Sequence, residues 1–410
     1  MKKILLLTFI FIRFSYLSAQ LLTTVAGGNG IGYAQNQLGY PESIFVDSIG
    51  NLYVVEQTNH RVQRFPPGST SATNGVTVAG SYVGAGANQL DHPFSIAVDA
   101  AGYIYVGDDY NHRLQRFPPG STGGTDAVSI GISSINAATP SGAINALYAD
   151  PSGNIYVTGT DRIIMFPPGS DSATIGIVVA GGTGPGSAAN QLNGPTGIGM
   201  DAHGNLYVAD AGNDRIQQFP PGSDSTTSAV TVGVGSHITN QNNVGANIFV
   251  TPRGDIYVSD GYSAVFLFPA GSNVNTLPST VVGGNGFGSG FNQLQRPYGV
   301  FVGIHGDVYI SDTENFRVLR FGEKISSGVS DISDLSTLPL YPNPNTGTFI
   351  LRTTDDIGRE YIITDLLGRA VVHQMITSNA QTISLHDITP GTYLIEVRGS
   401  ASKAIRFTVE

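Results

Sequence analysis

A short phrase occurs six times in this chain: a glycine turn followed by a Tyr-Val or Tyr-Ile pair. The six tyrosines are 52, 51, 51, 50 and 52 residues apart, at Tyr53, Tyr105, Tyr156, Tyr207, Tyr257 and Tyr309. Because the spacing drifts so little, each copy should be one supersecondary unit that packs on its neighbours in the same way. The spacing therefore predicts a repeat architecture.

Each unit contains four short extended segments. The first follows a proline, as in Pro93–Val98, and ends in an Asp-x-x-Gly turn; the second is the Tyr-Val segment. The third, as in Arg61–Phe65, stops at prolines, which cannot donate to a strand ladder. The fourth is represented by Val76–Gly80. Four short strands repeated about every 50 residues are typical of a β-propeller blade. We therefore predict an all-β fold and no helix.

The order of the segments predicts how the ring closes. The sixth unit supplies three strands, the last ending at Phe321, while an unmatched segment of the fourth type stands at residues 21–27. We predict that residues 21–27 form the outer strand of the last blade and so pair an edge that would otherwise be exposed.

These units resemble the NHL repeat, which builds six-bladed propellers. The pattern Pro-x-x-Ile-x-Met-Asp-x-x-Gly-Asn-x-Tyr-Val-x-Asp-x-x-Asn-x-Arg-Ile is complete from Pro195 to Ile216. The third and fifth units are shortened after the Tyr-Val segment and lose the Asn-x-Arg step. The resemblance implies one propeller over residues 20–321. It says little about activity, because one fold hosts many functions.

The segment before the repeat has the features of a secretory signal peptide. Met1-Lys2-Lys3 precedes the short apolar stretch Ile4–Ile12, which is too short to span a bilayer. We predict a signal peptide over 1–19, with cleavage after Ala19. After the repeat, residues 322–338 are rich in Ser, Gly and Asp and are predicted to be a linker.

Residues 339–410 are predicted to form a small β-sandwich. Six alternating segments follow the opening Tyr341-Pro342-Asn343-Pro344, separated by turn residues. The opening, the Asp365–Arg369 turn and Pro390–Tyr393 closely resemble the C-terminal sorting domain of the bacterial type IX secretion system. That resemblance implies recognition by an outer-membrane translocon and, in most members, removal by a sortase. The alternative is an ordinary sandwich domain with its own ligand.

Composition excludes several classes of function. The 410 residues contain no cysteine, which excludes thiol catalysis, thiolate zinc sites and disulfides. Residues 21–321 contain 20 Asp and Glu, 10 Arg and no Lys, a formal charge of −10. Nucleic acid and anionic membrane surfaces need a cationic face, so neither is an expected partner. No further segment approaches spanning length, and we expect no membrane insertion of the mature chain.

Two features that recur in the repeat contain polar side chains that could form a binding site. His60 and His112 occupy the same place in neighbouring units and could together help to bind a transition metal. The favoured interpretation is a solvent-facing turn. The Asp-x-x-Asn-x-Arg step, as at Asp108, Asn111 and Arg113, is interpreted as structural. Asp should accept backbone donors in the hairpin, Asn should take the left-handed position, and Arg should pair with a carboxylate.

An enzyme of the propeller lactonase or lyase type would gather oxygen ligands at a mouth of the central channel. The repeat places two columns of residues there. One column is Glu42, Phe94, Asn145, Thr196, Ala246 and Tyr298, and the other is Ser43, Ser95, Ala146, Gly197, Asn247 and Gly299. Twelve positions hold one carboxylate and two amides, fewer than a hard cation prefers. Glu42 and Asn145 are the best candidates if the alternative holds.

We therefore assign no catalytic, cofactor-binding or metal-binding residue from the sequence. The expected function is a non-catalytic binding or scaffold module, secreted or on the outer cell surface after passing the periplasm, with a protein or a glycan as ligand. Loops that break the repeat, Ser133–Ser141 and Ser236–Asn243, are the predicted contact segments. The alternative function is a metal-dependent lactonase or lyase.

Overall fold

The structure is a computed structural model. It describes residues 21–131, 144–235, 247–290, 292–303, 306–322, 340–341, 348–352, 360–365, 370–378, 380–385, 391–397 and 405–409. The predicted signal peptide and both predicted contact loops lie outside these residues, as does the predicted linker apart from Gly322, which ends a strand. No helix of the described part is long and apolar enough to cross a bilayer.

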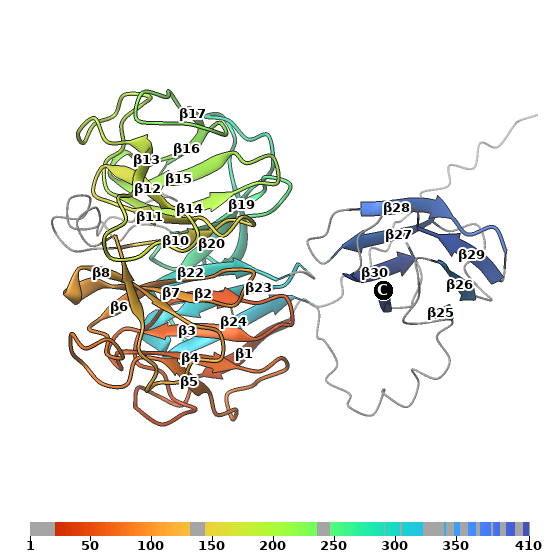
Figure 1. Ribbon diagram of the computed structural model, residues 1–410, viewed down its shortest axis with the longest axis horizontal. Helices are drawn as coiled ribbons and strands as arrows, with labels where there is room; N and C mark the ends of the chain where they lie inside the picture. Colours follow the sequence, from red (N-terminus) through yellow and green to blue (C-terminus); the bar gives the residue numbers. More distant parts are fainter. Residues whose placement is uncertain are drawn as a thin grey trace, which may run out of the picture.

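Six four-stranded antiparallel sheets form the blades of a β-propeller, which confirms the predicted fold (Figure 1). The first three blades are β2 (Pro41–Val46), β3 (Leu52–Glu56), β4 (Arg61–Phe65), β5 (Val76–Ala79); β6 (Pro93–Val98), β7 (Ile104–Asp108), β8 (Arg113–Phe117), β9 (Val128–Ile130); and β10 (Leu147–Ala149), β11 (Ile155–Thr158), β12 (Arg162–Phe166), β13 (Ile177–Gly181). The next two are β14 (Pro195–Met200), β15 (Leu206–Asp210), β16 (Arg215–Phe219), β17 (Val230–Val234); and β18 (Asn247–Val250), β19 (Ile256–Ser259), β20 (Ala264–Phe268), β21 (Ser279–Gly283). In every blade the first strand contacts the first strands of the neighbouring blades, so these strands surround the central channel.

The N-terminal strand completes the sixth blade. Its sheet has the order β1-β24-β23-β22, and these strands are β22 (Pro297–Val302), β23 (Val308–Asp312), β24 (Arg317–Gly322) and β1 (Leu21–Gly27). The pairing runs antiparallel from Leu21 opposite Gly322 to Gly27 opposite Arg317. This is the pairing that the unmatched segment at 21–27 predicts. Hydroxyl groups of the sixth blade also reach the first blade, as Thr313 Oγ1 donates to Pro41 O at 2.7 Å.

The blades are held together by apolar seams. A phenylalanine at the end of the third strand is fully buried in each of the first five blades: Phe65, Phe117, Phe166, Phe219 and Phe268. The leucine of the recurring Asn-Gln-Leu loop is also fully buried: Leu38, Leu90, Leu192 and Leu294. Each such side chain contributes about 1.5–3 kcal/mol relative to exposure. Each leucine therefore anchors its loop to the blades.

The Asp-x-x-Asn-x-Arg step ties a long loop to its blade. Asp108 is fully buried and accepts hydrogen bonds from Arg113 Nε at 2.7 Å and Asn111 Nδ2 at 2.9 Å. It also accepts the backbone N–H of Asp91 at 2.6 Å, which belongs to the preceding loop and not to the hairpin as expected. The Arg113 guanidinium donates to three carbonyls of the same loop. A structural role for the step is thus supported.

The left-handed position falls one residue later than predicted. It is occupied by His60, His112, Asp214 and Phe316, with φ of 53°, 50°, 51° and 52°. The prediction for Asn was wrong because Asn111 ends a 3₁₀ turn, and its amide bridges Asp108 and the carbonyl of Gly84 at 2.8 Å. The described helices are three such 3₁₀ turns: Asp109–Asn111 (η1), Ala211–Asn213 (η2) and Thr313–Asn315 (η3).

The C-terminal region consists of two sheets. One has the order β25-β26-β29, with β25 (Leu340–Tyr341), β26 (Thr348–Arg352) and β29 (Ala380–Ser384). The other has the order β28-β27-β30-β31, with β28 (Ala370–Met375), β27 (Glu360–Asp365), β30 (Gly391–Val397) and β31 (Ile405–Val409). Leu351 and Ile383 of the first sheet share a core with Tyr361, Ile363 and Ile395 of the second. The two sheets therefore form the predicted small sandwich.

Candidate functional site

The first predicted column lies near the start of the innermost strands and closes that end of the channel. Tyr298, on the sixth blade, donates its hydroxyl to the carbonyl of Asn145 on the third blade at 3.1 Å. Blades three and six are opposite each other in a ring of six, so this side chain crosses the channel. Phe94 packs edge-on against the Tyr298 ring, with centroids 4.6 Å apart. Phe94, Asn145 and Tyr298 are thus brought together as a plug, and Glu42 lies near enough to Tyr298 to affect its pKa.

Glu42 is buried in this plug and is not presented to solvent. Its side chain is 3% exposed. Burial raises the pKa of Glu42 from its ordinary value of 4.5 to about 8; Arg296 opposes this rise and Glu314 adds to it. Burial, with Glu42 and Asp109 nearby, also raises the pKa of the Tyr298 phenol. At neutral pH the Glu42 carboxyl is therefore largely protonated, a state in which it is a poor ligand for a hard cation.

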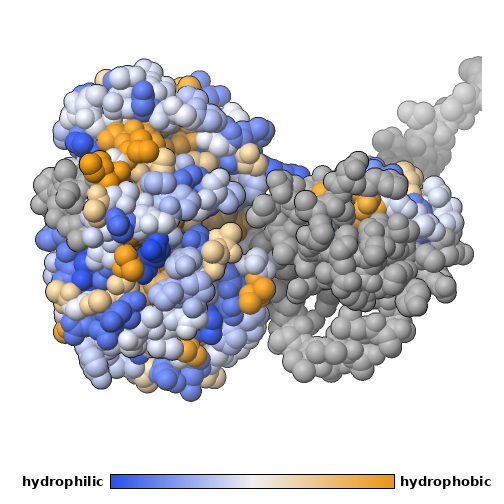
Figure 2. All heavy atoms as spheres, viewed as in Figure 1, coloured by the Kyte–Doolittle hydropathy of each residue, from blue (hydrophilic) through white to orange (hydrophobic). Residues whose placement is uncertain are grey.

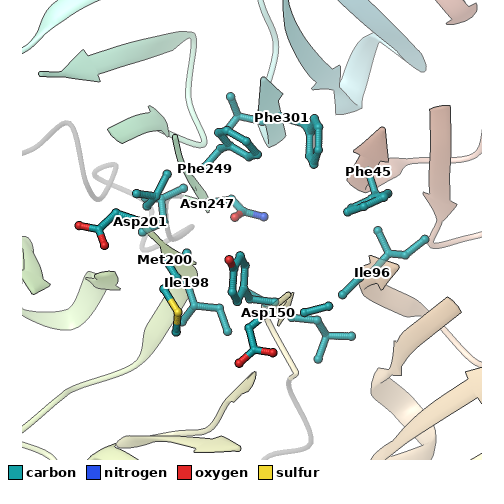
Figure 3. Close-up of a pocket in the computed structure, with 18 of the residues that line it drawn as sticks. Phe45, Ile96, Asp150, Ile198, Met200, Asp201, Asn247, Phe249 and Phe301 are labelled. Atoms are coloured by element: carbon teal, nitrogen blue, oxygen red, sulfur yellow. The ribbon is translucent and has the colours of Figure 1, made fainter. Parts of the chain in front are cut away.

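A pocket lies farther along the same strands, where each innermost strand meets its hairpin turn (Figure 3). Its volume is about 530 Å³. Phe301 contacts Phe249 and Phe45, with ring centroids 4.7 Å and 5.1 Å apart, so aromatic rings of the fifth, sixth and first blades form one continuous wall. Tyr148 and Met200 line the opposite side. These five side chains are half-buried and face an open space of the size that small-molecule sites occupy.

The carboxylates around the pocket already have partners. Asp150 accepts the backbone N–H groups of Ser152 and Asn154, both at 2.9 Å, and the Asn154 amide at 2.8 Å. Asp201 has the corresponding bonds in the fourth blade and also accepts the Tyr207 hydroxyl at 3.1 Å. These aspartates are the turn residues that the Asp-x-x-Gly pattern predicts. Asn247 offers a polar group at the centre of the view in Figure 3. The pocket is therefore mainly apolar.

The two columns predicted from the sequence are the second and third residues of the strands that start with proline, and most of the pocket lies beyond them. The informative column lies two positions farther on and contains Phe45, Ala97, Tyr148, Gly199, Phe249 and Phe301. Four aromatic residues in six equivalent positions were a signal available in the sequence. The second predicted column is divided: Ser43, Ala146 and Asn247 line the pocket. Ser95 is structural, because its Oγ donates to the carbonyl of Ile144 at 2.7 Å and joins the second and third blades.

The two repeated histidines do not lie in the same surroundings. His112 is exposed, as the sequence predicts. His60 is 15% exposed, and its ring packs against His92 with centroids 4.8 Å apart, so the prediction of a solvent-facing turn was wrong for His60. The reason is that the loop before β6 covers it. His60 and Asp91 lie together with His92, and not with His112.

Comparison with known families agrees with this architecture. Residues 339–409 match the secretion system C-terminal sorting domain, and residues 192–219 match the NHL repeat. The chain is an NHL-repeat six-bladed β-propeller with a C-terminal type IX secretion sorting domain. The sorting domain directs it to the cell surface or the extracellular space and implies interaction with the secretion machinery.

Solved structures show the same propeller. A structural genomics protein of unknown function from Bacteroides thetaiotaomicron has a TM-score of 0.54 at 16% identity, covering 74% of this chain and 76% of that chain. A gluconolactonase from Xanthomonas campestris has a TM-score of 0.50 at 12% identity, covering 75% and 92%. PorZ, a surface component of the type IX secretion system of Porphyromonas gingivalis, has a TM-score of 0.41 at 16% identity, covering 94% and 53%, and this score is too low to establish a shared fold. Such identities show the fold alone, and no curated protein matches the chain.

Proposed function

We propose that the propeller is a non-catalytic binding module outside the cell, and that its channel pocket receives an apolar group of a protein ligand. The observation that carries this proposal is the aromatic wall of Phe45, Phe249 and Phe301 around a space of about 530 Å³. Apolar walls favour an aliphatic or aromatic side chain, whereas a glycan needs several free donors and acceptors. On the face seen in Figure 2, hydrophobic residues form small separate patches, so the pocket is the more specific feature.

The pocket gives the first test. Phe301→Asn should weaken the binding of an environment-sensitive apolar dye roughly tenfold. The reason is that packing the dye against one aromatic side chain of the wall contributes about 1.5 kcal/mol or more to the free energy of binding. Fluorescence titration measures this. Tyr82→Asn is the control, since Tyr82 is 76% exposed and is not among the residues that line the pocket. Equal dye affinity in both variants and the unaltered protein would contradict an accessible apolar pocket. A protein partner captured from the cell surface should likewise be lost only with Phe301→Asn.

The alternative is a metal-dependent lactonase or lyase that uses Glu42 and Asn145. The plug argues against it, because Glu42 is only 3% exposed and the Tyr298 hydroxyl is bonded to the Asn145 backbone. Calorimetric titration with Ca²⁺ separates the two functions. We expect that the unaltered protein does not bind Ca²⁺ stoichiometrically and that Glu42→Ala gives the same titration. Tight binding lost in that variant, together with lactone turnover, would support the enzyme.

We also propose the export route and the domain limits: a signal peptide over 1–19, the propeller over 20–321, a linker over 322–338 and the sorting domain over 339–410. A chain that stops at Leu338 should fold but remain in the periplasm, because it lacks the segment that the translocon recognises. Fractionation with immunodetection measures the distribution. Normal amounts of the truncated chain in the medium would contradict the route. An internal control is the same fractionation of the complete chain.

A further inference from the structure

Three side chains with nitrogen or oxygen ligand atoms meet at the seam between the first and second blades. His60 lies in the turn between β3 and β4, and Asp91 and His92 immediately precede β6. The Nδ1 atom of His92 is 2.8 Å from Asp91 Oδ1, and the Nδ1 atom of His60 is 3.6 Å from the same oxygen. The side chains of His60, Asp91 and His92 are 15%, 27% and 31% exposed, so the group is accessible to solvent.

The seam between the sixth and first blades shows what packing alone requires at this place. There the equivalent residues are Phe316 and Tyr40, both in the left-handed region with φ of 52° and 48°. Their rings meet edge-on with centroids 5.2 Å apart, close to the 4.8 Å of His60 and His92. An aromatic pair is therefore sufficient for the seam. The seam between the first and second blades has two imidazoles in place of these rings. It also has the carboxylate of Asp91, where the equivalent residue before β2 is Gly39. These groups add ligand atoms that packing does not need.

We propose that His60, Asp91 and His92 form a binding site for Zn²⁺ that links the first and second blades. Two imidazole nitrogens and one carboxylate oxygen are a ligand set that zinc accepts. Ligands about 2.0–2.1 Å from a tetrahedral zinc lie roughly 3.3 Å apart, and the distances of 2.8 Å and 3.6 Å lie on either side of this value. Partial exposure leaves a fourth position for water.

Zinc would replace two hydrogen bonds of the metal-free site. The Nδ1 atom of His60 accepts the backbone N–H of His92 at 3.1 Å, so this nitrogen carries a lone pair. The Nδ1–H of His92 donates to Asp91 Oδ1, and that proton must leave when the metal binds. Tyr110 stacks on the His92 ring with centroids 4.1 Å apart and holds the ring in place. The site is thus oriented before binding, and its position is independent of the proposed pocket.

Zinc titration of the complete secreted chain in a non-chelating buffer tests the proposal. Calorimetry should show one equivalent of Zn²⁺ bound at this site, with the affinity lowered at least about tenfold in His92→Tyr. Tyrosine is chosen because Tyr40 occupies the equivalent position with the same backbone conformation, so the ring packing and the fold should be kept. His112→Ala is the matched control, since the exposed His112 occupies the place of His60 in the next repeat.

Zinc should also raise the melting temperature of the unaltered protein and of His112→Ala, but not of His92→Tyr. A second variant, His60→Phe, copies Phe316 and should lose zinc in the same way. The proposal is overturned if no stoichiometric zinc binds, or if His92→Tyr and His60→Phe bind it as tightly as the unaltered protein. The pocket experiments with dye do not depend on either outcome.

Discussion

Removal of residues 20–27 is expected to lower the melting temperature by roughly 10 °C or more. Without β1, the edge of β24 is unpaired along its length, and the core cluster that contains Val25 and Ala26 is opened. Burial of Val25 contributes about 1.5–3 kcal/mol and each ladder hydrogen bond about 1 kcal/mol. The sum is on the order of 5–10 kcal/mol, comparable to the whole stability of a typical domain.

A point variant tests the same closure without a deletion. Ala26→Asp places an unpaired charge at a fully buried position and should destabilise the propeller by several kcal/mol. Ala72→Asp makes the same change at an exposed turn and should have little effect. Differential scanning calorimetry measures both. If the deletion and Ala26→Asp melt like the unaltered protein, the ring does not depend on β1.

The second large effect is a loss of stability between about pH 4.5 and 8 that depends on Glu42. In the unfolded chain this carboxyl ionises near its ordinary pKa of 4.5, whereas in the folded protein burial raises the pKa to about 8. Its contribution is fully present below pH 4.5 and is lost progressively as the pH rises from 4.5 through about 8, because over this range the carboxyl is ionised in the unfolded chain but protonated in the folded protein. A pKa difference of this size corresponds to a loss on the order of 5 kcal/mol.

Glu42→Gln should remove this pH dependence, since glutamine has a similar shape and does not ionise. Urea unfolding at pH 5 and pH 9 gives the free energy of unfolding for each protein. We expect Glu42→Gln to be more stable than the unaltered protein at pH 9. Asp126→Asn, which neutralises an exposed carboxylate, should keep the original pH profile. Identical profiles for Glu42→Gln and the unaltered protein would show that Glu42 is solvated in the folded state.

Local patterns were sufficient to predict most of the propeller. Prolines and Asp-x-x-Gly turns mark strand ends within single segments, so Pro93–Val98 and Arg61–Phe65 were predicted with the limits of β6 and β4. The unmatched strand at 21–27 was predictable because a ring must pair its last edge. These features depend on backbone chemistry and on contacts that repeat in every blade.

The site depends on contacts that do not repeat. Nothing local to Tyr298 indicates that its hydroxyl reaches the third blade, or that the nearby Glu42 is buried. His92 meets His60 because two adjacent blades carry histidine at positions that hold tyrosine and phenylalanine elsewhere in the ring. Such contacts follow from the ring geometry. The aromatic column that contains Phe45 and Phe301, in contrast, could have been predicted by comparing later positions of the repeated innermost strand.

The pairing of β1 with β24 also sets the timing of folding. Thr23 and Arg320, joined by a hydrogen bond in this sheet, are 297 residues apart in the chain. The first strand to be synthesised must therefore wait for the last one before the ring can close, and loop-closure entropy makes this contact slow to form. During that interval the free edge of β24 can accept β1 of another copy and so exchange strands between molecules. A low protein concentration during folding should therefore favour the monomeric ring.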